Sequence, residues 1–239
     1  MHEEPYRWLE AIQNRREYIV DQMQGGTPVY AVSRPEGVLL LGVGTGRSKV
    51  FEIYDRHGFC ALGNPVDIEK LRQAAIESAH TEGFQRAPED VNLRRLVNFA
   101  LSPLLKNSYE SIFSPPLIVD GLFAEVGASM EDDVRVRLRF DGAPHFDVEG
   151  LLVASGDEEM TRRADRWLHE NLPDEADLGW VVTYCLATWA AISDDGNFED
   201  LEVPTGKVLT IPGREVEVAL LDRKVAGAAK YRQLDLQTL

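Results

Sequence analysis

The amino-acid sequence predicts an α+β fold, a four-layer α/β/β/α sandwich of two antiparallel sheets with an amphipathic helix at its N-terminus. The first observation behind this prediction is a group of four short apolar runs between residues 29 and 62, which leaves no room for a crossover helix. The second is the order of elements, because groups of strands alternate with two pairs of helices. Two stacked sheets with the helix pairs outside satisfy every apolar face in that order. At 239 residues the chain can bury a substantial core, and we expect residues 27–239 to form one domain after an N-terminal extension of residues 1–26.

The N-terminal helix is expected over residues 5–24, because proline is allowed in a first turn and Gly25-Gly26 stops a helix. Its apolar residues recur at spacings of four and seven and draw one stripe: Trp8, Ile12, Ile19 and Met23. This stripe fits either a helix that packs on its own domain or a helix that packs across neighbouring subunits.

The first strands are expected to pair as two hairpins. They are residues 29–32, 38–43, 49–53 and 58–62. Pro35 and Gly37 lie between the first two and supply the fixed and the permissive backbone that a hairpin turn needs. A polar corner at residues 54–57 joins the second pair.

Two helices follow and are expected to cover one face of a sheet. Asn64-Pro65-Val66-Asp67 favours a helix start, because it offers a side-chain cap, a proline in the first turn and an early acid, and Gly83 is expected to end this helix. The second helix is predicted over residues 90–109. Pro103 should bend it, because proline lacks a backbone donor.

The rest of the chain is predicted by the same reasoning. Strands are expected at residues 117–126, 134–140, 150–154, 207–211, 215–221 and 231–234, helices at residues 158–171 and 174–192, and a short helix before the last strand. The acidic stretch of residues 193–204 lacks the ligand spacing of an EF-hand calcium loop, which favours a surface loop.

Arginine alternates strictly with apolar residues between positions 134 and 140, so Arg135, Arg137 and Arg139 share one face of a strand. Such a face could bind anions or nucleic acid. In a strongly acidic protein it favours instead a solvated or intersubunit salt-bridging surface.

Composition excludes several classes of function. A net charge of −15 and a pI near 4.8 argue against unassisted binding of nucleic acid or anionic membranes. Cys60 and Cys185 lie in apolar sequence, which predicts buried, reduced thiols and a reducing compartment. No apolar signal region follows the N-terminus, and no segment approaches the roughly 20 apolar residues that span a bilayer.

No cofactor or metal is expected. The histidines are scattered, and no pair has ligand spacing with a carboxylate: they are His2, His57, His80, His145 and His169. The glycine-rich stretch at residues 42–46 lacks the lysine and the following helix of a phosphate-binding loop.

The first two hairpins also carry a longer pattern. It reads Glu36-Gly37-Val38-Leu39-Leu40, then, after a short gap, Lys49-Val50-Phe51-Glu52-Ile53-Tyr54-Asp55-Arg56-His57-Gly58-Phe59, and then Gly63. This pattern resembles the opening sheet of the proteasome subunit family within the N-terminal nucleophile hydrolases. The Y-D-R-x-G-F form is similar to the α-type subunits of actinobacteria in particular. Order and spacing continue to match almost to the C-terminus, and the resemblance implies the same four-layer sandwich.

The resemblance implies a non-catalytic α-type subunit that acts in protein degradation in a bacterial cytoplasm. Such a subunit would form an outer ring with copies of itself, expected to be seven-membered, and cap a ring of β-type protease subunits. It would narrow the substrate entrance and dock a regulatory ATPase or another activator. In the family the N-terminal helix lies on the outer face of the ring and helps to assemble it. The tyrosine-aspartate-arginine triplet of archaeal and eukaryotic α subunits is absent from residues 1–10, so gating built on that triplet is not expected.

A catalytic β-type or bacterial proteasome-like threonine protease is the alternative. Active subunits use an N-terminal threonine freed by self-cleavage after glycine, together with an aspartate and a lysine. Alignment on the first hairpin puts Thr27 at the nucleophile position after Gly26, and Lys49 at the lysine position. The aspartate position falls on Val43, which cannot balance the charge of the lysine, and Pro28 is a further departure.

Lys49 has a second role under the resemblance. In α-type subunits this lysine lies in a pocket between neighbouring subunits and pairs with the C-terminal carboxylate of an activator tail. A compact cation in a partly dehydrated groove suits that ligand, whereas a lysine simply exposed at a strand end would have no such role. Gly63 would let the backbone of the tail approach closely, or would serve only the turn into the following helix.

Overall fold

The computed structural model of the chain describes residues 4–194 and 196–239. Residues 1–3, which include His2 and belong to the expected N-terminal extension, lie outside the described residues. The helices are α1 (Glu4–Met23), α2 (Pro65–Gln85), α3 (Leu93–Leu96), α4 (Ser102–Glu110), α5 (Glu158–Asn171) and α6 (Leu178–Ser193). The strands are β1 (Val29–Arg34), β2 (Gly37–Gly44), β3 (Val50–Tyr54), β4 (His57–Gly63), β5 (Val119–Glu125), β6 (Val134–Arg139), β7 (Pro144–Asp147), β8 (Leu151–Ala154), β9 (Glu215–Asp222) and β10 (Tyr231–Gln233). Short 3₁₀ turns lie at Pro88–Asp90, Met130–Asp132 and Leu236–Thr238.

The strands form two five-stranded sheets in which every pair is antiparallel. Sheet A has the order β10-β9-β2-β1-β8, and sheet B has the order β3-β4-β5-β6-β7. The first hairpin pairs Val29 with Gly42 and Arg34 with Gly37, so its turn is tight. Gly37 is required there, because a Cβ would lie 1.9 Å from the carbonyl oxygen of Leu221.

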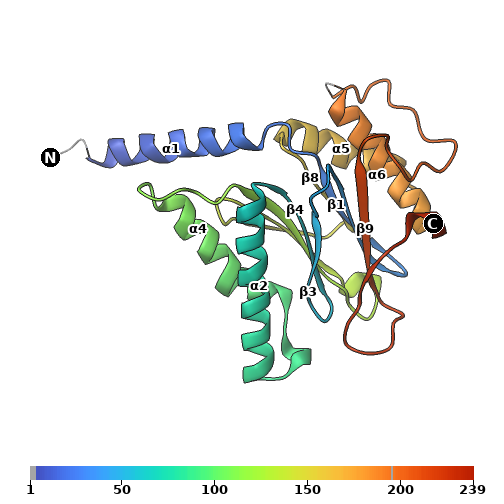
Figure 1. Cartoon of the computed structure of the whole chain (residues 1–239), viewed down its shortest axis with the longest axis horizontal. Coiled ribbons are helices and arrows are strands. Elements are labelled where there is room, and N and C mark those ends of the chain that lie inside the picture. The colour runs from blue at the N-terminus through green and yellow to red at the C-terminus, as the bar shows by residue number, and fades with distance from the viewer. Residues whose placement is uncertain (1–3, 195) are drawn as a thin grey trace.

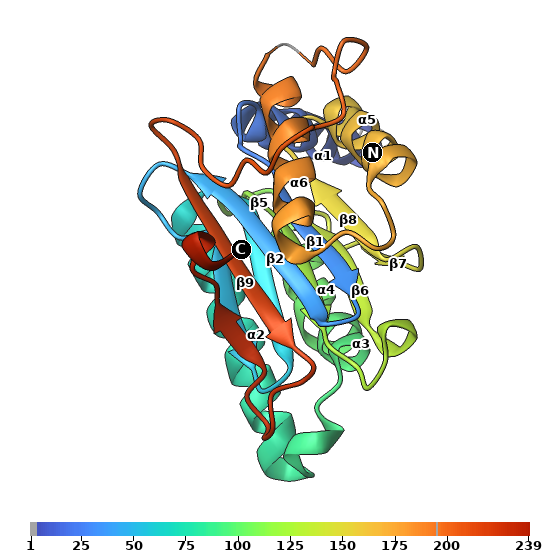
Figure 2. The same cartoon turned by 90° about the vertical axis from the view of Figure 1, so that its right-hand side faces the viewer.

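Three apolar clusters fill the spaces between four layers, and this arrangement confirms the predicted α/β/β/α sandwich. The inner faces of the two sheets meet in a cluster that includes Leu40, Cys60 and Leu122. The outer face of sheet A packs against α5 and α6, and the outer face of sheet B packs against α2 to α4. Figure 1 shows α2 and α4 on one side of the strands and α6 on the other, and Figure 2 shows sheet A with α6 lying across it. Both cysteines are buried and free.

Helix α1 leaves the sandwich at one end, and its N-terminal half projects away from the sheets (Figure 1). Its C-terminal half is anchored by Ile19 and Met23, which are buried in the cluster between the sheets. The chain after α1 passes very close to the loop after β8, because the amide of Gly156 donates to the carbonyl of Gly26 at 3.3 Å. A Cβ at position 156 would lie 2.0 Å from the carbonyl oxygen of Met23, so glycine is required at this contact.

The helices differ from their predicted bounds by more than one residue in three places. Helix α2 continues to Gln85 instead of ending at Gly83 as predicted. The helix predicted from position 90 begins at Leu93 behind an Asn92 cap, and a π turn at Val97–Leu101 widens it just before Pro103. The helix predicted from residue 174 begins at Leu178, because the Asp177 side chain caps the Trp180 amide at 3.0 Å.

Two predictions near the C-terminus are wrong. Residues 207–211 form no strand; the Val208 amide donates at 3.0 Å to the hydroxyl of Thr183 on α6, while β10 occupies the edge of sheet A. The short helix predicted before the last strand is a hairpin loop, closed where the Asp222 amide donates to the Lys230 carbonyl at 2.8 Å.

The expectation of a solvated or intersubunit arginine face on β6 is also wrong. Arg135 and Arg137 are buried. Arg137 donates to the Asp120 carboxylate at 2.6 Å and to Glu158 at the start of α5 at 2.9 Å. Arg135 donates to Asp147 at 2.8 Å. Burial acts to lower the pKa of Arg137, but Asp120 and Glu158 raise it, so the guanidinium stays charged. Its acidic partners lie within the same chain.

We predict that Asp120→Ala lowers the free energy of unfolding by about 3 to 5 kcal/mol, because it leaves the Arg137 guanidinium buried without its closest partner. Urea unfolding followed by tryptophan fluorescence, at one fixed protein concentration, measures this change. Glu159→Ala is the control, since it breaks an exposed pair with Arg162 and should cost less than about 1 kcal/mol. Equal losses in the two variants would contradict the prediction.

Candidate functional site

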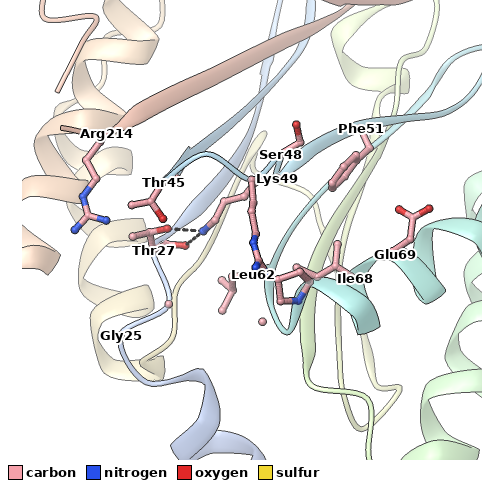
Figure 3. A pocket seen from close by; sticks show the side chains of 15 residues that line it. Gly25, Thr27, Thr45, Ser48, Lys49, Phe51, Leu62, Ile68, Glu69 and Arg214 are labelled. Carbon is pink, nitrogen blue, oxygen red and sulfur yellow. Dashed lines mark hydrogen bonds between the residues drawn. The ribbon is translucent and has the colours of Figure 1, made fainter. Parts of the chain in front are cut away.

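A cavity of about 290 Å³ opens where the chain passes from sheet A to sheet B. Its walls come from the segment before β1, the β2–β3 connection, the end of β4 and the first turn of α2. The cavity is lined by all three candidate site residues predicted from the sequence, which are Thr27, Lys49 and Gly63. Figure 3 shows Thr27 and Lys49 directed toward each other, with Phe51, Ile68 and Glu69 on one side and Arg214 on the other.

Lys49 and Thr27 are in direct contact. The Lys49 ammonium donates to the Thr27 carbonyl at 2.8 Å and also to the Thr27 Oγ1. Thr27 Oγ1 donates in turn to the carbonyl of Val43. In the described part of the chain, no carboxylate forms a salt bridge with the Lys49 ammonium. Lys49 is therefore a half-buried cation that is hydrogen-bonded but carries no counter-ion.

Burial lowers the pKa of Lys49 from 10.5 to about 8, against the opposing influence of Cys60 and Glu217, and the nearby Arg214 lowers it further. Because the folded pKa lies below the unfolded one, a charged Lys49 costs stability below about pH 8. That cost is relieved as the pH rises from about 8 toward 10.5.

Glu217 on β9 holds the backbone of this lysine. Its carboxylate accepts from the amide of Lys49 at 3.0 Å and from the amide of Val50 at 3.3 Å. Glu217 is buried, and burial raises its pKa although the two amides act in the opposite direction. Glu217 could not be singled out from the sequence, because it is one of two acids that alternate with valine in the β9 pattern.

Val43, at the position of the catalytic aspartate, faces away from the cavity. Its side chain is buried in the apolar cluster between sheet A and α6. The residue of β2 that faces the lysine is Gly42, where a Cβ would lie 2.9 Å from the Cβ of Lys49. Neither position places a carboxylate beside the threonine and the lysine.

Gly63 lines the cavity, and its backbone adopts a φ of +125°. A Cβ there would lie 2.2 Å from the carbonyl oxygen of Ile118, the residue before β5. Contacts inside the chain are sufficient to require glycine at this position.

Comparison of the sequence with those of known proteins identifies relatives of the chain. No protein-family model matches the chain. It is 34% identical over 195 residues to the proteasome subunit alpha of Actinosynnema mirum, an alignment that covers 81% of this chain and 73% of that protein. It is 30% identical over 236 residues to the proteasome subunit alpha of Salinispora tropica, covering 95% of this chain and 85% of the relative. The corresponding protein of Streptosporangium roseum is 31% identical over 216 residues, covering 90% and 76%.

The chain belongs to the proteasome α-subunit family. This membership agrees with the two stacked sheets and with the α1 helix that precedes them. Among the residues that the structure describes, no group of histidine, cysteine and acidic side chains could hold a metal ion. No helix in the described ranges is long and apolar enough to cross a membrane.

Two further residues of this α-type chain reach the site without a signal in the sequence. Glu217 positions the lysine backbone, and Arg214, just before β9, lines the cavity. Both lie more than 160 residues after Lys49, and only the pairing of β9 with β2 brings them to it.

We predict that Lys49 titrates with a midpoint near pH 8, because burial disfavours its charged form. Lysine Cε chemical shifts followed by NMR from about pH 6 to about pH 11 report the midpoint, and the Lys49→Met variant identifies the signal. Thr27→Val removes one acceptor of the charged form and should lower the midpoint further. A midpoint at the ordinary lysine value of 10.5 would rule the burial effect out.

Proposed function

We propose that the chain is a non-catalytic α-type subunit that forms the outer ring of a proteasome core particle in the cytoplasm. In this role it caps a ring of β-type subunits, restricts the substrate entrance and docks the C-terminal tails of a regulatory ATPase or another activator. The observation that carries the proposal is Lys49, a cation without a counter-ion that faces an open cavity.

A peptide C-terminus supplies what Lys49 lacks. A terminal carboxylate entering the cavity would replace the weak neutral acceptors of Thr27 with a full negative charge. Phe51 and Ile68 offer an apolar wall for the side chains of the tail. Gly63 lies in the same wall, and its backbone would face the backbone of the tail.

Helix α1 supports the ring proposal. Trp8, Leu9 and Tyr18 are 45%, 58% and 51% exposed, which is more than a helix packed only on its own domain requires. Arg15 fixes the helix by donating to the carbonyls of Ser108 at 2.8 Å and Ser114 at 2.7 Å. A ring-packing extension of residues 1–26 would use these exposed residues against a neighbouring copy.

The alternative, a threonine protease, is favoured by one observation. Thr27 Oγ1 accepts a hydrogen bond from Lys49, whose pKa is about 8, and this is a suitable arrangement for activating a hydroxyl. The arrangement lacks a carboxylate to orient the lysine, because Val43 faces α6. The peptide bond before Thr27 is also held in place, through the hydrogen bond from the Gly156 amide to the Gly26 carbonyl.

We predict that the chain binds a fluorescent peptide ending in a free carboxylate and does not bind the same peptide as an amide. Fluorescence anisotropy should show about tenfold weaker binding at pH 9 than at pH 7, because Lys49 loses its charge above about pH 8. The Lys49→Arg variant keeps its charge, so its affinity should not depend on pH over this range. Binding of the amide with equal affinity, or unchanged binding by Lys49→Ala, would reject the docking role.

We predict that mass spectrometry of the purified chain shows an intact N-terminus and, under native conditions, a ring of several copies. Trp8→Glu should dissociate the ring, because it places a charge in the proposed contact, whereas Phe84→Glu on an exposed position of α2 should not. Loss of residues 1–26, together with peptide hydrolysis that Thr27→Ala abolishes, would establish the protease instead.

A further inference from the structure

The cavity around Lys49 is more basic than one terminal carboxylate requires. Arg47 from the β2–β3 connection and Arg214 from the segment before β9 line it together with Lys49. The chain as a whole carries a net charge of −15. The three cations around this cavity of about 290 Å³ therefore form a local excess of positive charge in an acidic protein. Such a local excess attracts anions and raises their concentration at the site.

The one acid in the wall does not cancel this charge. Glu69 on α2 already accepts from Arg72 at 2.8 Å and from Gln73 at 2.7 Å, along the surface of its own helix. These hydrogen bonds, from Arg72 and then Gln73, lower the pKa of Glu69 to about 2. Glu217 is not among the residues that line the cavity, and its carboxylate accepts from the backbone amides of Lys49 and Val50.

In the part of the chain that the structure describes, neither Arg47 nor Arg214 forms a salt bridge with an acidic side chain. Arg214 instead lies over the ring of Trp189 on α6, with its guanidinium carbon 6.0 Å from the ring centre. Arg214 lies on the opposite side of Thr27 and Lys49 from Phe51 and Glu69 (Figure 3). A planar guanidinium in that place suits a second carboxylate, which it can bind with two parallel hydrogen bonds.

We propose that this cavity selects activator tails that carry an acidic side chain within their last few residues, in addition to the terminal carboxylate. The terminal carboxylate binds Lys49, the acidic side chain binds Arg214 and Arg47, and an apolar residue between them packs against Phe51 and Ile68. The inference rests on the proposed docking function and specifies the chemistry of the tail that docks. Arg47 and Arg214 are then the residues that determine specificity, whereas Lys49 supplies the contact common to every tail.

The test measures fluorescence anisotropy of the full-length chain at pH 7 with four labelled octapeptides. Three end in a free carboxylate and carry glutamate, glutamine or lysine at the third position from the end, and the fourth is the glutamate peptide as an amide. We expect the glutamate peptide to bind about fivefold tighter than the glutamine peptide and the lysine peptide to bind weakest. The preference should shrink as salt is added.

Arg214→Gln and Arg47→Gln should each reduce the preference for glutamate and leave affinity for the glutamine peptide within about twofold. Arg86→Gln, an exposed arginine at the end of α2, makes the same change in net charge outside the cavity and should keep the preference. Circular dichroism confirms that each variant is folded.

The outcomes separate this inference from the function on which it rests. Equal binding of the glutamate and glutamine peptides, with binding still dependent on Lys49 and on the free carboxylate, would overturn the acidic-tail inference alone. Retention of the preference in both arginine variants would overturn it as well. Equal binding of the carboxylate and amide peptides would overturn the docking function itself.

Discussion

The site depends on how the chain crosses from one sheet to the other between β2 and β3. A crossing segment leaves the ladder of sheet A before it joins sheet B, so its backbone amides need partners from elsewhere. Glu217 on the neighbouring strand of sheet A accepts from the amides of Lys49 and Val50 and so fixes where β3 begins. The same crossing brings the Lys49 side chain against Thr27, at the start of the other sheet. One carboxylate therefore satisfies the backbone while the ammonium remains without a counter-ion.

The buried arginines of β6 differ from Lys49 in their partners. Arg137 has the Asp120 and Glu158 carboxylates within hydrogen-bond distance, and Arg135 has Asp147. Those pairs link β5, β6, β7 and α5 and neutralise charge inside the fold. Lys49 differs from Arg135 and Arg137 because all of its hydrogen-bond acceptors are neutral, and it lines a cavity. This contrast is the reason to regard Lys49 as a binding residue and the arginines of β6 as structural ones.

Much of the fold could be predicted from the sequence because apolar alternation fixes which face of each strand is buried. The strand predicted at residues 207–211 failed because the same alternation also fits a segment that lies on α6 through Thr183. The prediction for the arginines of β6 was wrong for a related reason. Alternation shows that these arginines share one face of the strand, but it does not show that acids from distant positions, such as Asp120, cover that face. At the site, Thr27 and Lys49 came from the resemblance to a family. Glu217 and Arg214 could not be found, since only strand pairing brings β9 beside β2.

The close approach of Met23 to Gly156 has a mechanical consequence. Helix α1 has 20 residues and is about 30 Å long, and its direction is set where it meets the sandwich. A rotation of about 5° at that point would displace the far end by about 2.5 Å, which is more than a well-packed contact tolerates. Because Gly156 has no side chain, Met23 can pack against it, and this contact sets the direction of α1. A residue far from the N-terminal end of the helix therefore determines the position of that end.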